Sequence, residues 1–407
     1  MTSGNPLQST RQLSSQAVVE VLLREAPLSR VQIAKVTGLS KQTVNEIVRQ
    51  LEAEGWVSKH GMSQGEVGRR AATYSMQPDA GYVIGVDLGA TKLRVALSDL
   101  GGSTVAQGEV ATDRRGGTHL LDQIHTTSVR LAGEVGVGWG RVLSSAIGGP
   151  GVFNAATGAM DRAPNVPGLG DMDVAGALRD RLGHEITIDN DVNMAVAGER
   201  WRGVAQDCAN FAFIALGTGI GMGIFMDGAV RRGANGAAGE IAYAPFADDP
   251  FDVSLHEHGP LEEVLSSHGF SASYTALTDE QACPELIFER YGAQQDAARQ
   301  AVAAYARHIA IVLSTVTAFL DPELIVVGGG IGSRPGLVAE VIPLYRRLAA
   351  STAEIRTSAL GAQASLVGAT AVALGQVHNR LFAAAVPERL PLPVPGPALE
   401  PPARSAR

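Results

Sequence analysis

The segment Val83–Asp99, VIGVDLGATKLRVALSD, constrains the fold of this chain more than any other stretch. An apolar run rich in β-branched residues ends at Asp87, and a short turn through Gly89 leads into a second strand. Apolar and polar residues alternate in that strand, which predicts a half-buried hairpin partner. A carboxylate at a strand end, a glycine and the pair Thr91-Lys92 are typical of a turn that holds a phosphate and a metal ion. The Walker A spacing is absent, so an ordinary hairpin with a polar tip remains an alternative.

A second segment repeats this pattern later in the chain. Phe211–Val230 reads FAFIALGTGIGMGIFMDGAV, again a strand, a glycine-rich turn and a strand. Helices and strands alternate around both segments, so we predict a duplicated, two-lobed α/β body that closes on a nucleotide. A further strand, within Ile325–Ile331, ends in three glycines, which permit the close approach of a flat ligand such as adenine.

The first 77 residues have the pattern of a winged helix-turn-helix. They predict a helix over 14–25, two helices that meet at a turn containing Gly38, and two short strands flanking a basic loop. The start of the third helix would enter the major groove, and the loop, or wing, would contact the DNA backbone or the minor groove. The residues predicted to contact DNA are Ser40, Lys41, Gln42, Thr43, Asn45, Arg49, Arg69 and Arg70. A small helical packing module with a solvated basic loop is the alternative.

Charge and cysteine content narrow the class of protein. The 407 residues are 45 % hydrophobic and 18 % charged, enough for a large core in about two or three domains. Residues 1–77 carry 9 Lys and Arg against 6 Asp and Glu, a net +3, whereas the rest carries 24 against 35, a net −11. A basic head on an acidic body suits a head that binds nucleic acid. Two distant cysteines, Cys208 and Cys283, with no apolar run of membrane length and no apolar leader, predict a soluble cytoplasmic protein.

Six motifs, in order, resemble those of the ROK family of sugar kinases and sugar-responsive repressors. They are DLGATK at Asp87–Lys92 and LGTGIGMG at Leu216–Gly223 for the two phosphate loops, GGG at Gly328–Gly330 for the adenosine segment, and PNVPG at Pro164–Gly168, DNDVN at Asp189–Asn193 and GANGAAGEIAY at Gly233–Tyr243 for the sugar-contacting segments. The resemblance covers about Met76–Phe382 and implies the two-lobed actin-like ATPase fold. The winged head is a feature of the repressor branch that the kinase branch lacks.

The resemblance implies roles for individual residues. Asp191 would be the base that takes a proton from an attacking sugar hydroxyl, and Asp87 would order Mg²⁺ beside ATP. The residues implied in sugar binding are Asn165, Asn190, Asp191, Glu240, Tyr243 and Glu262. Those implied in nucleotide binding are Asp87, Gly89, Thr91, Lys92, Gly217, Thr218, Gly219, Gly221, Gly328 and Gly329.

The chain departs from the family pattern where the family binds zinc. Ala242-Tyr243 replaces the usual Gly-His, and the matching segment DVSLHEHGPLEEV has no cysteine where the family has a cysteine cluster. His256 and His258 remain, but zinc takes four ligands. We therefore predict that the zinc site is lost, with Glu262 retained at the end of the segment.

These features predict five parts of the chain and a regulatory function. The parts are a flexible N-terminus at 1–13, the winged head at 14–77, a first α/β lobe at 82–190 with 365–385, a second lobe at 191–364 and a disordered Pro-rich tail at 387–407. We predict a transcriptional repressor of carbohydrate-utilisation genes that binds a palindromic operator as a homodimer or higher homo-oligomer, responds to a monosaccharide, and has no membrane partner. An ATP-dependent hexose kinase with an attached DNA-binding head is the main alternative. A sugar-binding body with inactive phosphate loops and a head used for protein contacts is the third.

Overall fold

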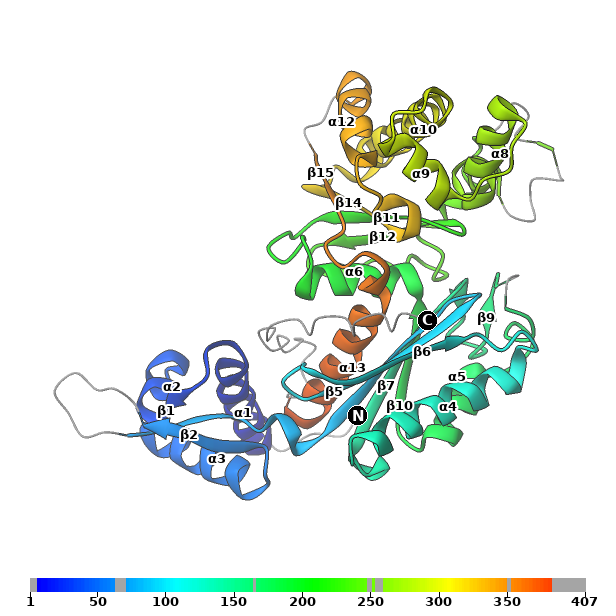
Figure 1. Cartoon of the computed structure of the whole chain (residues 1–407). Helices are drawn as coiled ribbons and strands as arrows, with labels where there is room; N and C mark the ends of the chain where they lie inside the picture. The colour runs from blue at the N-terminus through cyan, green and yellow to red at the C-terminus, as the bar shows by residue number, and fades with distance from the viewer. Residues whose placement is uncertain are drawn as a thin grey trace. The chain divides into compact units, whose positions relative to one another are not determined.

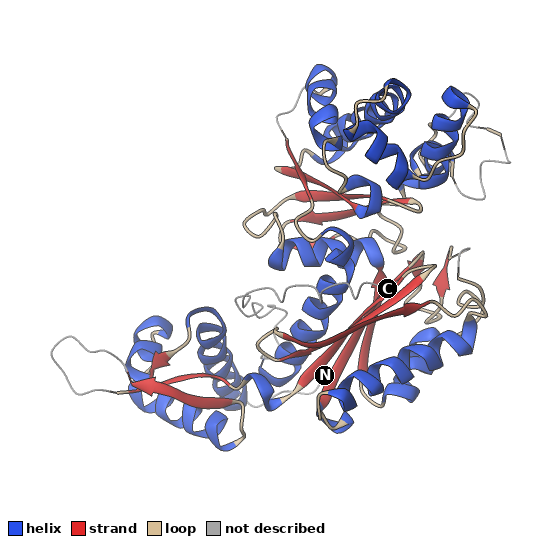
Figure 2. Ribbon diagram, viewed as in Figure 1, coloured by secondary structure: helices blue, strands red, loops and turns tan. Residues whose placement is uncertain are grey.

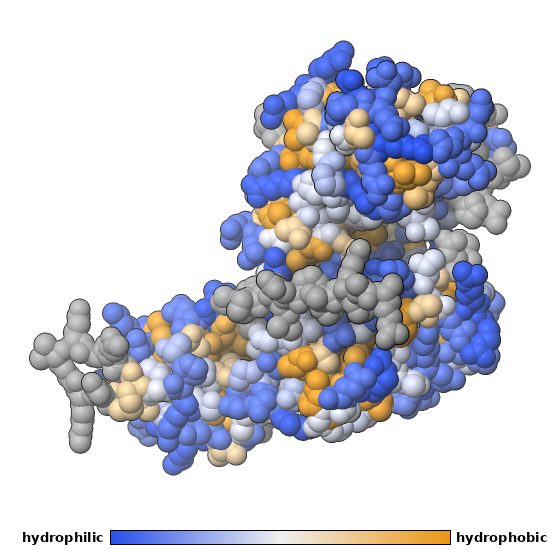
Figure 3. All heavy atoms as spheres, in the orientation of Figure 1, coloured by the Kyte–Doolittle hydropathy of each residue, from blue (hydrophilic) through white to orange (hydrophobic). Residues whose placement is uncertain are grey.

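The computed structural model describes residues 6–62, 71–163, 166–246, 251–252, 259–349 and 353–382. The chain divides into two compact units (Figure 1). The first comprises Met1–Pro150, Thr157–Ile188 and Ala369–Arg407, and the second comprises Gly151–Ala156 and Asp189–Gly368. Hydrophilic residues predominate on the face drawn in Figure 3, with smaller hydrophobic patches between them.

The first unit begins with a small head that holds the predicted winged helix-turn-helix (Figure 2). Its elements are α1 (Pro6–Glu25), β1 (Leu28–Ser29), α2 (Arg30–Thr37), α3 (Lys41–Ala53), β2 (Val57–Met62) and β3 (Ala72–Met76), with the strands in the order β1-β3-β2. The side chain of Ser29 caps α2 in a capping box with Gln32, and Ser40 caps α3. Gly38 adopts a φ of +71° in the turn between α2 and α3, a conformation that glycine adopts without strain.

The head has its own hydrophobic core. Val18, Ile33 and Val48, one from each helix, are completely buried, and Tyr74 of β3 completes the cluster. The guanidinium of Arg30 lies 4.7 Å from the centre of the Tyr74 ring, which covers that edge of the core. α1 starts at Pro6, so residues 6–13, which we predicted to be flexible, are helical; proline is favoured in the first turn of a helix because its missing N–H is not needed there.

The rest of the first unit is a five-stranded mixed sheet with helices packed against it. Its elements are β4 (Tyr82–Leu88), β5 (Lys92–Asp99), β6 (Thr104–Ala111), α4 (Gly117–Glu134), β7 (Val142–Gly149), β9 (Met160–Asp161), α5 (Val174–Leu182), β10 (Glu185–Asn190) and most of α13 (Ala364–Phe382). The strand order is β10-β7-β4-β5-β6, with β4 and β5 antiparallel and β4 and β7 parallel. The predicted half-buried character of β5 is wrong at Ala96 and Ser98, because these small side chains are buried and the face expected to be polar is covered at both positions.

The second unit repeats this design. Its elements are β8 (Val152–Phe153), α6 (Asp191–Arg202), β11 (Phe211–Leu216), β12 (Ile220–Met226), β13 (Ala229–Val230), α7 (Pro260–Leu265), α8 (Ser267–Thr278), α9 (Pro284–Gly292), α10 (Asp296–Leu320), β14 (Leu324–Gly328), α11 (Gly329–Gly332), α12 (Leu337–Leu348) and β15 (Glu354–Thr357). The strand order is β13-β12-β11-β14-β15, with β11 and β12 forming an antiparallel hairpin and β14 and β15 parallel to β11. Each sheet therefore contains a hairpin followed by a parallel strand, and the predicted two-lobed α/β body is confirmed.

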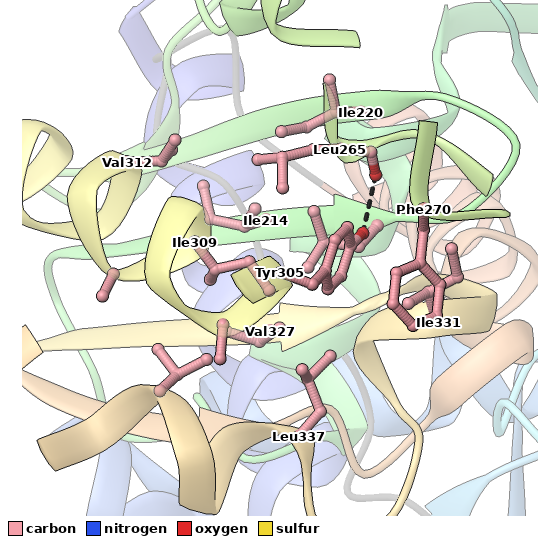
Figure 4. Close-up of a cluster of buried hydrophobic side chains, with 14 of the residues drawn as sticks. Ile214, Ile220, Leu265, Phe270, Tyr305, Ile309, Val312, Val327, Ile331 and Leu337 are labelled. Carbon is pink, nitrogen blue, oxygen red and sulfur yellow. Dashed lines mark hydrogen bonds between the residues drawn. The ribbon is translucent and has the colours of Figure 1, made fainter. Parts of the chain in front are cut away.

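Helix α10 is the centre of the second unit's core (Figure 4). Tyr305 donates a hydrogen bond of 2.6 Å from its hydroxyl to the carbonyl oxygen of Leu265, and its ring lies 4.5 Å from that of Phe270, centre to centre. By length and composition α10 could also cross a membrane, and it is the one such helix among the described residues. Half of its most apolar stretch is buried inside the unit, and the core contacts of Tyr305 and Ile309 account for that composition.

Candidate functional site

Helix α3 separates a polar face from an apolar one. Val44, Ile47, Val48 and Leu51 are buried in the head, whereas Lys41, Gln42, Asn45 and Arg49 are exposed. The predicted contacts Ser40 and Thr43 belong to the cap, because Ser40 Oγ accepts a hydrogen bond of 3.1 Å from the Thr43 N–H. The exposed residues at the start of α3 are those that a helix-turn-helix presents to the major groove. Arg69 and Arg70 lie outside the described residues, and their role stays a prediction.

In the first phosphate loop, Asp87 is paired with an arginine that the sequence analysis did not identify. Asp87 is buried near the end of β4, and its Oδ2 lies 2.8 Å from Arg94 Nη1. Arg94 Nε also donates to Glu109 Oε2 at 2.8 Å, and Lys92 Nζ lies 2.7 Å from Glu109 Oε1. The hydrogen bonds from Lys92 and then Arg94 lower the pKa of the Glu109 carboxyl below its usual range. Lys92, predicted to meet a nucleotide, is therefore engaged by Glu109.

The turn between β4 and β5 is fixed by the strand that follows. The Gly89 N–H donates to the Lys92 carbonyl oxygen at 3.0 Å, and Thr112 Oγ1 donates to the Gly89 carbonyl oxygen at 2.7 Å. A magnesium site normally needs one or two carboxylates with charge available to the ion. Since Arg94 neutralises Asp87 here, this segment does not offer such a carboxylate to Mg²⁺.

No metal cluster is found within the described part of the chain. No group of three or more His, Cys, Asp and Glu side chains there could hold an ion. His256 and His258 are outside the described ranges, so the loss of the zinc site stays a prediction.

In the second unit, the second phosphate loop meets the three-glycine segment. The loop is closed by a hydrogen bond of 3.0 Å from the Gly217 N–H to the Gly219 carbonyl oxygen, with Thr218 exposed at its tip. A Cβ on Gly217 would lie 3.5 Å from the backbone nitrogen of Gly330, so the two backbone segments are neighbours. Glu262 contacts the loop from α7, because its Oε2 accepts a hydrogen bond of 3.1 Å from the Ile220 N–H.

The glycines of these segments differ in the space that surrounds them. A Cβ on Gly328 would lie 2.4 Å from the Phe213 ring, on Gly329 2.4 Å from the Leu216 carbonyl oxygen, and on Gly221 2.7 Å from Val192. Internal packing alone therefore accounts for those three, whatever they bind. Gly330, which we did not predict as a site residue, has nothing within 4 Å of such a Cβ. Within the run Gly328–Gly330 it is therefore the glycine with room for a ligand beside it.

The start of α6 is held by two side chains and presents a third. Asn190 caps the helix through Oδ1, which accepts from the Val192 N–H at 2.8 Å, and its Nδ2 donates to the Gly151 carbonyl oxygen at 2.9 Å. Both ends of the predicted sugar-binding amide are thus used within the protein. Asp191, the first residue of α6, is only partly buried and follows directly in the helix.

Two residues that the sequence analysis missed support this helix start. The carboxylate of Asp189 is buried and accepts hydrogen bonds from Asn193 Nδ2 at 2.9 Å and Arg232 Nε at 2.7 Å. Arg232 directly precedes the glycine-rich segment that begins at Gly233. The sequence did offer a signal, because Asp189 is the first acid of the DND motif, but we predicted no role for it.

Glu240, Tyr243 and Glu262 come from neighbouring elements of the second unit. Glu240 precedes the short 3₁₀ helix η3 (Ile241–Tyr243), which contacts α7, the helix that carries Glu262. Tyr243 is 40 % exposed and can offer its hydroxyl to a ligand. The contact is close because Gly259 lies against the backbone of Ala242, where a Cβ would come within 2.4 Å of the carbonyl oxygen. Asn165 is not among the described residues.

The winged head and the repeated sheets with a glycine-rich turn in each define a DNA-binding regulator with a sugar-kinase-like body. The chain belongs to the ROK family: the ROK family model matches residues 83–376, and a winged helix-turn-helix DNA-binding model matches residues 13–58.

Its relatives include both regulators and kinases. The chain is 25 % identical over 335 residues to a xylose repressor from Caldicellulosiruptor bescii, covering 78 % of this chain and 83 % of the relative. It is 27 % identical over 320 residues to a glucokinase from Halalkalibacterium halodurans, covering 70 % and 93 %. Among solved structures, a ROK family transcriptional regulator described as a homolog of the E. coli MLC protein aligns with a TM-score of 0.76 over 92 % of this chain and 98 % of that one, at 21 % identity, and supports the fold alone. A ROK hexokinase from Thermus thermophilus aligns with a TM-score of 0.64 over 73 % and 99 %, at 27 % identity.

Proposed function

We propose that this protein is a sugar-responsive DNA-binding transcriptional regulator, a repressor whose head binds operator DNA and whose ROK body binds a monosaccharide. The observation that carries the proposal is the polar, solvent-facing side of α3 on a head with its own core. Phosphorylating a sugar requires no such head. The relatives named xylose repressor, which extend over most of this chain, support the same function.

The second unit supplies the chemistry for a sugar effector. A sugar hydroxyl both donates and accepts hydrogen bonds, so its site needs carboxylates and hydroxyls that can bond in pairs. Asp191, Glu240, Tyr243 and Glu262 are of these types and lie in the second unit, and we assign the effector to them. Asn190 would not contact the sugar directly. Its amide positions the start of α6, and with it Asp191.

The effector would act by favouring one arrangement of the protein over another. A ligand shifts such an equilibrium only by its difference in affinity for the two states. We infer that the sugar binds more tightly to a state in which two heads no longer match half-sites one helical turn apart on a palindromic operator. Repression would then end when the sugar is present.

An ATP-dependent hexose kinase is the second candidate. It is favoured by the convergence of Gly217 and Gly330 and by Asp191 at the start of α6, the position at which we expect a base. The named glucokinase relative supports nucleotide binding in this body. The two activities are compatible in one chain.

Operator binding tests the first candidate. Full-length protein should enrich a palindromic sequence from randomised DNA and retain it in a gel shift. Gln42→Ala and Arg69→Ala should strongly weaken this retention, whereas Gln50→Ala, at a residue bonded to Glu54 near the end of α3, should not. Unchanged retention by Gln42→Ala and Arg69→Ala would remove the head from DNA recognition.

A thermal-shift screen over monosaccharides, with and without Mg-ATP, tests the body. A ligand that binds the native state raises the melting temperature by mass action. We expect one class of sugar to stabilise the protein and to release the operator. For the kinase, the same sugar should drive ATP consumption by the natural protein and not by Asp191→Asn; equal consumption by both would remove Asp191 from the catalytic role.

A further inference from the structure

Helix α3 carries a carboxylate on the face that the proposed function turns toward DNA. Glu46 is exposed and lies one turn after Gln42, with Gln42 Nε2 and Glu46 Oε1 3.4 Å apart. At 100° per residue, Gln42, Glu46 and Arg49 fall opposite the buried stripe of Val44, Ile47, Val48 and Leu51. Glu46 therefore lies near the centre of the polar face and not at its edge.

The charge of Glu46 is not balanced inside the head. The other acid of α3, Glu52, lies 3.6 Å from Arg30 and 3.3 Å from Lys59. Within the described ranges, no Lys, Arg or His nitrogen lies within 4.0 Å of Glu46, and its side-chain hydrogen bond there is with Gln42, which is neutral. A solvated carboxylate is harmless in water, but on a DNA-reading face it meets the phosphates, which repel it.

Two groups in the major groove donate hydrogen bonds, the N4 amino group of cytosine and the N6 amino group of adenine, and a carboxylate pairs with the first because the N7 acceptor beside the adenine amino group repels it. The exocyclic N4 amino group of cytosine donates a hydrogen bond there, and Glu and Asp are the side chains that accept it. We propose that Glu46 accepts this hydrogen bond and so specifies one C·G base pair in each half-site. This inference rests on the proposed DNA-binding function.

Gln42 contributes by its position. Side chains four residues apart on a helix are neighbours, so the hydrogen bond from Gln42 to Glu46 holds both side chains extended along the same face. The two then read base pairs that are adjacent or nearly so. The preference for C·G should depend on Glu46, and the preference at the neighbouring position on Gln42.

The test is base selection by full-length protein. Sites are enriched from randomised duplex DNA with each of four proteins: the natural protein, Glu46→Gln, Glu46→Ala and the control Glu54→Gln. The affinity of each protein is then measured for single-base variants of the enriched site. Glu54 is a good control because it is an exposed acid just beyond α3, bonded to Gln50 at 2.8 Å. Melting curves should be the same for all four proteins, since neither acid belongs to the head's core.

We expect the natural protein and Glu54→Gln to prefer C·G at one position of each half-site by about tenfold or more, the discrimination typical of a good base contact. Glu46→Ala should lose that preference and keep the others, and Glu46→Gln should change it toward adenine, which an amide reads. If Glu46→Ala binds every sequence more tightly with unchanged base preferences, the carboxylate acts only by repelling phosphates and the proposal is wrong. If the natural protein enriches no sequence at all, the proposed function fails with it, which is a different outcome.

Discussion

The buried carboxylate of Asp189 accepts a hydrogen bond of 2.7 Å from Nε of Arg232, a residue 43 positions later in the chain. The same carboxylate accepts one from Asn193 in the first turn of α6. These contacts attach the segment before the glycine-rich loop to the start of the helix that presents Asp191. The position of Asp191 should therefore depend on Arg232.

Replacing Arg232 by Met should destabilise the second unit and weaken its response to sugar. Removing one partner of a fully buried ion pair costs about 3–5 kcal/mol; the side chain of Arg232 is 43 % exposed, so we expect about 1–2 kcal/mol. Urea unfolding measures the loss, and the sugar-induced thermal shift measures the weakened binding. The neighbouring variant Arg231→Met is the control, because Arg231 pairs with an Asp227 that is 79 % exposed, and such pairs contribute little. Equal effects of the two variants would contradict a positioning role for Arg232.

Two glycine variants should separate packing from ligand contact. A Cβ on Gly368 would lie 1.6 Å from the Met194 carbonyl oxygen, where the start of α13 crosses α6. Gly368→Ala must push the two helices apart, so it should lower the melting temperature strongly or prevent folding. Gly330→Ala meets nothing within 4 Å and should melt like the natural protein. If Gly330→Ala also loses the thermal shift caused by ATP, Gly330 lines a nucleotide site; an unchanged shift would place the nucleotide elsewhere.

Stability should fall in acid because of a histidine in α13. His378 is fully buried, and burial lowers the pKa of its imidazole to about 4 from an ordinary value of 6.5. Below pH 6.5 the unfolded chain binds a proton at this residue that the folded chain does not bind until about pH 4. The contribution of His378 to the free energy of unfolding should therefore be constant above about pH 7. It should decrease from there to pH 4, by at most about 3 kcal/mol.

Urea unfolding at a series of pH values measures this effect. His378→Leu should make the profile between pH 4 and 6.5 less steep, whatever it does to stability at pH 7; a slope from His184 remains, because burial lowers the pKa of that imidazole to about 4 as well. His119→Gln, at an exposed position of α4, should leave the slope as it is. An unchanged slope in His378→Leu would show that other groups cause the acid loss.

The sequence was sufficient for the features that periodicity encodes. The two hairpins, the order of elements in the head and the repeated α/β pattern follow from apolar spacing, caps and glycine turns, and each of these signals is local. Val44 and Val48 could be assigned to the core because they recur at helical spacing on α3. The start of α1 at Pro6 was missed because the apolar stripe we relied on begins only at Val18.

The contacts within the site depend on pairings between strands and on distant segments. Arg94 lies opposite both Asp87 and Glu109, a relationship that requires the register of three strands. Aligning the hairpin residue by residue would have placed Arg94 opposite Asp87. The motif DLGATK ends at Lys92, however, and does not include Arg94. No pattern in the sequence near Arg232 indicates its role, since its partner Asp189 is distant in sequence. The difference between Gly328 and Gly330 also appears only when their neighbours are known.

The salt dependence of operator binding should identify phosphate contacts on α3. Arg49 is exposed one turn beyond Asn45. We expect the helix to leave the groove there, with a phosphate within reach of the guanidinium. Each neutralised phosphate adds about 0.9 to the slope of log K against log salt concentration, because a condensed counterion is released. Arg49→Gln should therefore weaken binding to every sequence alike and lower the slope by about 1, whereas Gln42→Ala should weaken the best operator most and leave the slope unchanged. Titrations between 50 and 200 mM salt, roughly the range over which such binding changes most, measure both quantities. A sequence-dependent loss in Arg49→Gln with no change in slope would instead place Arg49 on a base, next to Glu46 and Gln42.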